Sequence, residues 1–244
     1  MATPIYYPFI AAPGNQANAS LVEVPLLRRP LNDGTPNSDR IWRYEIDEQA
    51  LESALQREDV RVLLWCNPHN PTGRVWTRDE MRVVARLCAE NNVALLSDEV
   101  WADLVLDESA TPFTGAAAML APDEVGEDLA KAGLVVLTSP SKTYNVAALD
   151  LAIAVIPDEK ARRRFTAAGR DKAEVPPFGY AAALAIFEDS DGEVEMWRRR
   201  LVDYLRANRD QVCMNECCSF GTSPAKFHRG DWVLCLGRAS SSVG

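Results

Sequence analysis

The stretch L-T-S-P-S-K-T-Y-N, residues 137–145, has Lys142 at its centre. The residues just before it, 133–137, form a short run rich in Val and Leu, which is typical of a buried parallel strand. A lysine just past the carboxyl end of an inner strand lies where α/β sheets place their ligands. The chain has 5 lysines against 21 arginines, so this lysine, flanked by Ser139, Ser141 and Thr143, indicates a need for an amine that can form a Schiff base. The alternative is a solvated loop lysine.

Length, composition and charge are those of a globular chain with one large domain or two small ones. The 244 residues are 47% hydrophobic and 25% charged. The net charge of −9 argues against nonspecific binding to nucleic acid, and no apolar run is long enough to span a membrane. The first residues, M-A-T-P-I-Y-Y-P-F, lack the features of a signal peptide, so we expect a cytoplasmic protein. Cys66 and Cys88 lie in apolar segments and are expected to be buried.

Strands and helices alternate along the chain, which predicts an α/β fold with a mostly parallel, doubly wound sheet. Asp47 and a Thr77–Glu80 capping box mark the starts of two helices. Residues 1–19, with three prolines and a glycine, are expected to be loop. The expected strands are residues 20–27, 60–66, 93–96, 133–137 and 149–156. The expected helices are residues 47–57, 123–132, 158–168, 176–188 and 192–210, together with one that opens at residue 77.

Polar side chains follow three of these strands: Asn70 follows strand 60–66, Asp98 follows strand 93–96, and Lys142 follows strand 133–137. Because parallel strands end at the same edge of a sheet, we expect the three to converge. Tyr6 and Tyr7 precede them on a proline-bounded turn. This set of side chains suits a pyridoxal phosphate pocket. The amine can bind the cofactor aldehyde and the carboxylate can keep the pyridine nitrogen protonated, while the amide and the aromatic ring can contact the cofactor ring. The alternatives are that Asp98 only caps a strand end and that Asn70 is only a turn residue.

Four segments carry a resemblance to a known family: T-P-I-Y-Y-P-F, C-N-P-H-N-P-T-G-R-V-W-T-R-D-E, S-D-E-V-W-A-D-L-V and S-P-S-K-T-Y-N-V-A-A-L. In order and spacing they resemble the fold type I pyridoxal-phosphate enzymes of aminotransferase class I/II, in the cystathionine β-lyase-like branch typified by the MalY/PatB proteins. The resemblance runs from about residue 3 to about residue 210. It implies that the chain forms the large domain of such an enzyme.

The resemblance also implies roles around the cofactor ring. Lys142 would be the Schiff-base lysine and Asp98 would pair with the pyridine nitrogen. Asn70 would donate to the phenolate oxygen, and Tyr6 would stack on the ring. The family usually has His or Tyr three residues after the aspartate, where this chain has Trp101, whose indole N–H can donate to the same oxygen.

For the cofactor phosphate the resemblance implies contacts from Ser139 and Ser141. The implied activity is C–S β-lyase action on cystathionine or on cysteine S-conjugates. A pyridoxal-phosphate-dependent aminotransferase and a catalytically dead remnant stay open as alternatives. The implied partners are a small amino-acid substrate and, in the full-length family, a second copy in a homodimer. Neither nucleic acid, a membrane nor a metal is expected.

Both ends of the chain depart from the family. We expect residues 1–210 to be a partial large domain and residues 211–244 to be an aberrant or unrelated tail. The family's upstream phosphate cradle and its downstream domain with a substrate-binding arginine are not recognisable, so we expect weak cofactor uptake and no measurable lyase activity from this chain alone. A zinc site in the tail is the rival reading, but it contains no C-x-x-C pair. The residues of that rival site are Cys213, Cys217, Cys218, His228 and Cys235.

Other chemistries lack their motifs. The sequence contains no G-x-S-x-G elbow, no G-x-x-x-x-G-K-[ST] loop and no G-x-G-x-x-G. His69 and His228 are the two histidines, which disfavours a histidine-based triad. We expect His69, inside the Asn-Pro turn, to be structural or to face solvent.

Overall fold

A computed structural model describes residues 1–30, 42–107, 111–169 and 174–219, without the side chains of residues 16, 17 and 212–219. The strands are β1 (Ala2–Thr3), β2 (Val24–Pro25), β3 (Leu27–Pro30), β4 (Trp42–Glu45), β5 (Val62–Cys66), β6 (Ala94–Asp98), β7 (Leu134–Thr138) and β8 (Ile153–Val155). The helices are α1 (Tyr7–Ala17), α2 (Glu48–Leu55), α3 (Arg78–Glu90), α4 (Glu127–Ala132), α5 (Glu159–Gly169), α6 (Pro177–Phe187) and α7 (Glu193–Ser219). Three short 3-10 helices are η2 (Ala102–Leu104), η3 (Ala116–Leu120) and η4 (Ala147–Leu149).

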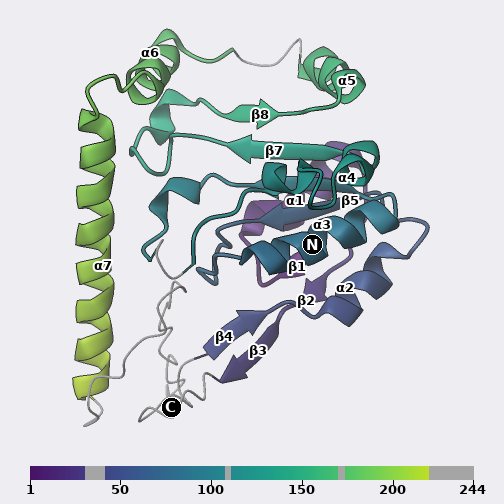
Figure 1. Ribbon diagram of the computed structural model, residues 1–244, viewed down its shortest axis with the longest axis horizontal. Coiled ribbons are helices and arrows are strands. Elements are labelled where there is room, and N and C mark those ends of the chain that lie inside the picture. The colour runs from purple at the N-terminus through teal and green to yellow at the C-terminus, as the bar shows by residue number, and fades with distance from the viewer. Residues whose placement is uncertain (31–41, 108–110, 170–173, 220–244) are drawn as a thin grey trace, which may run out of the picture.

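The main sheet has the order β5-β6-β7-β8 (Figure 1). Its first three strands are parallel, and β8 pairs antiparallel to β7. The predicted, mostly parallel sheet is therefore present. Two small sheets, β1-β2 and β3-β4, lie outside it. All three parallel strands end at the same edge, where the predicted site residues follow.

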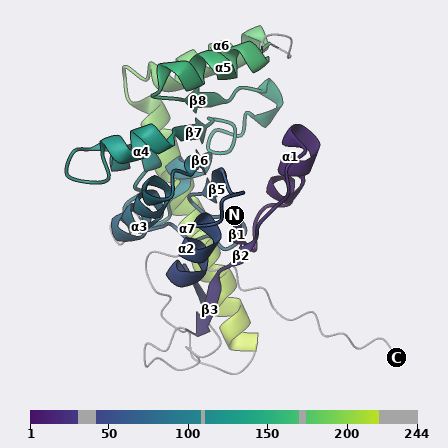
Figure 2. The ribbon, with the colours of Figure 1, turned by 90° about the vertical axis from the view of Figure 1, so that its right-hand side faces the viewer.

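The two faces of the sheet are covered unequally. Alternate residues point to opposite faces, and the register aligns Leu63, Leu95 and Leu134, which are buried under α2, α3 and α4. The opposite face carries the aligned row Leu64, Leu96 and Val135, which is only partly buried. On that side lies α1 (Figure 2). Phe9 of α1 and Leu64 both pack against a small buried cluster that includes Cys66. The strand sequences are apolar on both faces, but only one face has a continuous helical layer.

Two predicted helix starts are confirmed by side-chain caps. The Asp47 carboxylate accepts from Ala50 N–H at 2.9 Å, one residue before α2 begins. Thr77 Oγ1 accepts from Glu80 N–H at 3.2 Å, while the Glu80 carboxylate accepts from Thr77 N–H at 2.8 Å. This reciprocal pair satisfies two N–H groups that the start of α3 would otherwise leave without partners.

The prediction that residues 1–19 form a loop is wrong, because they contain helix α1. Pro8 lies in the first turn of that helix, where a missing N–H is no loss. Pro13 lies inside α1, which ends at Ala17, and the next residue, Asn18, has a left-handed backbone at φ 46°. The expected strand 20–27 is divided between β2 and β3, and the expected strand 149–156 shortens to β8.

Helix α7 extends past residue 210 to Ser219. Within the described ranges, no helix combines the length and the apolar character needed to cross a lipid bilayer. The residues of the zinc alternative cannot be placed. His228 and Cys235 lie outside the described residues, and the side chains of Cys213, Cys217 and Cys218 lie outside the described side chains.

The prediction that Cys66 and Cys88 are buried is confirmed. Burial raises the pKa of each thiol to about 12. The thiolate is the reactive form, so we expect a maleimide at pH 8 to label both residues roughly a thousandfold more slowly in the folded chain than in denaturant. Peptide mapping after timed labelling measures the two rates. Equal rates with and without denaturant would contradict the buried positions.

Candidate active site

The carboxyl ends of β5, β6 and β7 are tied together by backbone hydrogen bonds. Asn67 N–H, just after β5, donates to Asp98 O at 2.9 Å. Glu99 N–H, just after β6, donates to Leu137 O at 2.8 Å. The loops that carry Asn70, Asp98 and Lys142 therefore leave the sheet side by side.

Lys142 lies in a tight turn after β7. Ser139 Oγ donates to Leu151 O at 2.6 Å and accepts from Ser141 N–H at 3.1 Å, and Tyr144 N–H donates to Pro140 O at 3.0 Å. These bonds hold the turn, while the Lys142 side chain stays exposed. Its Nζ lies 5.6 Å from the centre of the Trp101 ring, a cation–π distance.

Asp98 ends β6 with a half-buried carboxylate. Its Oδ1 accepts from Val100 N–H at 3.2 Å. Burial raises the pKa of Asp98, and this effect outweighs the opposing effects of the Val100 N–H group and of the Lys142 charge. An amine and a partly desolvated carboxylate thus act on each other at the strand edge, as the sequence predicted.

A buried polar set behind Asp98 anchors the same edge. Glu99 Oε1 accepts from Ser97 Oγ at 2.9 Å and from Ala116 N–H at 2.7 Å. Asn67 Nδ2 donates to Thr114 O at 3.0 Å. The Asn67 and Glu99 side chains, at the ends of two neighbouring strands, therefore hydrogen-bond to the same segment, residues 114–116. The quoted S-D-E motif contains Glu99, but its partner lies too far along the chain for sequence reasoning to find.

Tyr6 and Asn70 are also brought together, because Tyr6 N–H donates to Asn70 O at 3.0 Å. His69 joins the same two segments. Its Nε2 lies 2.8 Å from Pro4 O, and a carbonyl only accepts, so Nε2 donates. The ring is 1% exposed, which confirms the structural role predicted for His69 and excludes the solvent-facing one. Burial lowers the pKa of this imidazole.

The predicted site residues thus form two groups. Lys142, Asp98 and Trp101 interact in one, with Ser139 and Ser141 bracing its turn, while Tyr6 and Asn70 form the other. Among the described residues, no hydrogen bond or ring contact links Tyr6 or Asn70 to Lys142. The structure adds Tyr144, two residues after Lys142, which stacks on Trp197 of α7.

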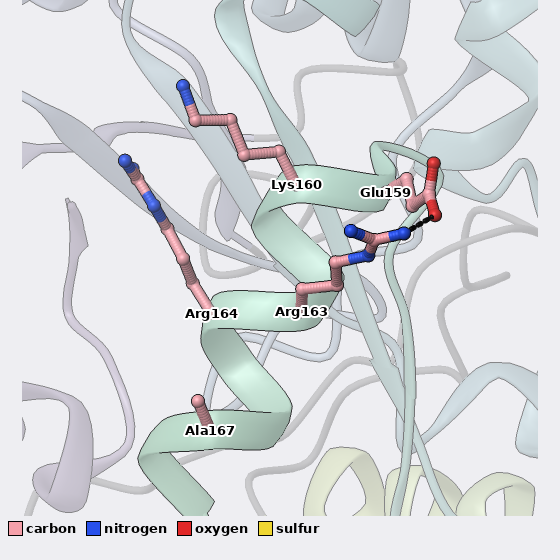
Figure 3. Close-up of a pocket in the computed structure, with 5 residues that line it drawn as sticks. All are labelled: Glu159, Lys160, Arg163, Arg164 and Ala167. Atoms are coloured by element: carbon pink, nitrogen blue, oxygen red, sulfur yellow. Dashed lines mark hydrogen bonds and ion pairs between the residues drawn. The ribbon is translucent and has the colours of Figure 1, made fainter.

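A separate hollow of about 320 Å³ runs along α5 (Figure 3). Its lining comes from this single helix, and Arg163 is paired with Glu159 at 2.6 Å while Lys160 and Arg164 point away from that pair. The lining contains no residue from the carboxyl ends of the parallel strands. The candidate site is therefore the strand edge and not this hollow.

Comparison with known proteins identifies the family. The aminotransferase class I and II family matches residues 35–218. The chain belongs to this family. The motif-based assignment to aminotransferase class I/II is thereby confirmed.

Relatives in this family point to the same branch. Cystathionine beta-lyase PatB of Bacillus subtilis is 30% identical over 212 residues, covering 86% of this chain and 48% of PatB. Protein MalY of Escherichia coli is 29% identical over 214 residues, again covering 86% of this chain and 48% of MalY. The chain spans about half the length of the curated relatives it matches.

The crystal structure of cystalysin from Treponema denticola, which contains a pyridoxal 5'-phosphate cofactor, superimposes with a TM-score of 0.72 at 29% identity. The match covers 87% of this chain and 48% of cystalysin. The fold predicted from the motifs, the large domain of a fold type I pyridoxal-phosphate enzyme, is therefore confirmed. The individual roles of the site residues and the domain boundary at residue 210 stay predictions.

Proposed function

We propose that this aminotransferase class I and II chain binds pyridoxal phosphate at the strand edge and serves C–S β-elimination from cystathionine or cysteine S-conjugates. The observation that carries the proposal is the meeting of Lys142, Asp98 and Trp101 where three parallel strands end. The similarity to cystathionine beta-lyase PatB supports the lyase reading, and the similarity to cystalysin, whose structure contains pyridoxal 5'-phosphate, supports the cofactor.

The residues at this edge fit the proposed cofactor. A half-buried carboxylate suits a protonated pyridine nitrogen, because Asp98 is partly desolvated and its strongest described countercharge is the Lys142 amine. Next to Lys142 in the chain, the Thr143 hydroxyl is buried without a hydrogen-bond partner among the described residues, so this turn has one polar atom that a ligand or a water would satisfy. Pyridoxal phosphate, when bound, supplies an electron sink for the charge that develops at the substrate Cα.

Each predicted contact then has a place in the proposal. Lys142 would hold the cofactor and Asp98 its ring nitrogen. Asn70 and Trp101 would donate to the phenolate oxygen, and Tyr6, which is 49% exposed, would be free to cover the ring.

The phosphate contacts of Ser139 and Ser141 stay predictions. For Ser139 to make its contact, the hydroxyl would have to turn away from Leu151 O, to which it now donates. Ser141 uses its backbone N–H within the turn.

In the proposed reaction the Lys142 amine, free of the cofactor once the substrate amine is bound, would take the proton from the substrate Cα. The Cβ–S bond would then break with its electron pair leaving on sulfur, and the proton held by Lys142 would convert that sulfur to the thiol. Water hydrolyses the remaining three-carbon enamine to pyruvate and ammonia. Asp98 would stabilise the positive charge on the ring nitrogen of the bound cofactor while the Cα proton is moved.

The finer features of the proposal are a homodimer and a cytoplasmic location. The large apolar side chains of α6 are mostly exposed, and such a surface supports the proposal that this helix packs against a second polypeptide. These side chains are Phe178, Tyr180, Leu184 and Phe187.

Product analysis tests the function and separates it from the two alternatives. The proposed function predicts that purified chain with pyridoxal phosphate and L-cystathionine releases pyruvate, measured with lactate dehydrogenase and NADH, whereas the sequence predicted no measurable lyase activity from this chain alone. A parallel sample with 2-oxoglutarate is expected to form no more glutamate than a blank. Glutamate without pyruvate would mean an aminotransferase, and neither product would mean a catalytically dead chain.

A further inference from the structure

One turn of α7 contacts the loops that carry two site residues. The ring of Trp197 stacks on Tyr144, with ring centres 5.9 Å apart and planes inclined by 25°. Tyr144 belongs to the same tight turn as Lys142. The stack therefore connects α7 to the backbone that carries the amine.

The next residue of α7 holds the second loop. Arg198 Nη1 donates to Asp103 O at 2.8 Å, and Asp103 lies in η2, which starts directly after Trp101. Glu195 orients the guanidinium through two bonds of 2.7 and 2.9 Å. Neighbouring residues of one helix thus reach both sides of the Lys142–Trp101 contact.

The rest of α7 is seated firmly enough for this turn to act as a fixed support. Val202 is buried against Leu104 and Leu106. Further along, Arg206 Nε donates to Leu106 O at 2.8 Å, and Arg209 pairs with Asp107 at 2.5 Å. In Figure 1 the arrowhead of β7 points toward α7, so the helix stands beside the edge where the site lies.

We infer that Trp197 and Arg198 are positioning residues, which hold the Lys142 turn and the Trp101 loop in register so that the amine stays beside Asp98. This inference rests on the proposed cofactor function. The physical reason is that Lys142 is exposed and has a long side chain with several rotatable bonds, so the position of its amine depends on how tightly its turn is held.

The test measures where pyridoxal phosphate is fixed by borohydride in the full chain, as the ratio of labelled Lys142 to labelled Lys131 in one peptide map. Lys131 is a suitable internal standard because it is exposed on α4 and pairs with Asp128. Trp197→Leu and Tyr144→Leu each remove the stack and are expected to lower the ratio about three- to tenfold, the range of one aromatic pair. The double variant is expected to fall no further than the single ones.

Matched variants separate positioning from folding. Tyr144→Phe and Trp197→Phe keep a ring and are expected to keep the ratio. Tyr204→Leu removes an exposed aromatic side chain from the same helix and is expected to leave the ratio unchanged. Should Trp197→Leu fail to fold by circular dichroism, the comparison of Tyr144→Leu with Tyr144→Phe decides.

The outcomes distinguish this inference from the function on which it rests. If the unsubstituted chain labels Lys142 no more than Lys131, the proposed function fails. If the unsubstituted chain prefers Lys142 and the leucine variants keep that preference, the function stands and the positioning role is wrong. A fall in Tyr204→Leu equal to that in Trp197→Leu would likewise overturn the role, because the effect would then be general to α7.

Discussion

Lys142→Ala is expected to abolish borohydride fixation of pyridoxal phosphate at the strand edge and to lower any pyruvate formation by about 10²–10⁴-fold. Of the described lysines, Lys142 alone lies in the turn after β7, with its Nζ over the Trp101 ring and its charge acting on Asp98. Lys131 is exposed and already paired with acidic neighbours on α4, and Lys160 lines the hollow on α5. Mass mapping of the reduced protein gives the fixed position, and a coupled assay gives the rate.

Two controls sharpen this prediction. Lys142→Arg keeps a cation over the Trp101 ring, but a guanidinium cannot bind the cofactor aldehyde covalently, so this variant should be as deficient as the alanine variant. Lys131→Ala removes an amine away from the site and should retain full fixation. A Lys142→Arg variant that still fixes the cofactor, or a label that moves to Lys131 or Lys160 without loss of activity, would show that another lysine holds it.

Asp98→Asn is expected to make the cofactor-free chain more stable and the loaded chain far less active. The substitution removes a partly desolvated charge but leaves an oxygen that can accept from Val100 N–H. Removing one such electrostatic group from a reacting centre costs about 100-fold or more, so exchange of the substrate Cα proton should slow by that factor. Removing a partly desolvated charge is expected to add about 0.5–2 kcal/mol to the free energy of unfolding.

The pH dependence of the stability gain follows from the pKa of Asp98. Burial raises this pKa in the folded chain, so the folded state holds the carboxyl proton more tightly than the unfolded state does. Ionisation therefore costs folding free energy. The cost begins near the unfolded-state pKa, grows as pH rises through the raised folded-state value, and is constant above it. The advantage of Asp98→Asn should be full above the raised folded-state pKa and should shrink as the pH falls toward the ordinary range of an aspartate carboxyl.

Urea unfolding of both proteins at several pH values measures the difference in stability, and loss of deuterium from Cα-labelled substrate measures the exchange. Glu99→Gln is the matched control for carboxylate removal, since the amide oxygen can still accept from Ser97 and Ala116. Glu99→Gln should change the rate of Cα-proton exchange by less than about tenfold relative to the unsubstituted chain. An unchanged exchange rate in Asp98→Asn would contradict the role given to Asp98, and a stability gain that does not depend on pH would contradict its electrostatic origin.

The sequence by itself determined the features that depend on residues within one turn or one strand of each other. The Asp47 cap, the Thr77–Glu80 capping box and the apolar runs of β5, β6 and β7 all lie where the pattern predicts them. A cap needs only neighbours three residues away, and a parallel sheet places its carboxyl ends at one edge whatever the loops do. For this reason the sequence was enough to predict that Asp98 and Lys142 lie close together.

The tertiary structure alone decided the features that depend on distant partners. Prolines predicted a loop where α1 forms, because no local signal says that Phe9 of this segment packs against the same buried cluster as Leu64 of β5. The hold of Glu99 on Ala116 and the stack of Trp197 on Tyr144 join segments far apart in the chain. Such contacts depend on which face of a helix packs against which loop. The same sequence pattern is compatible with many different packing arrangements, so it does not specify one of them.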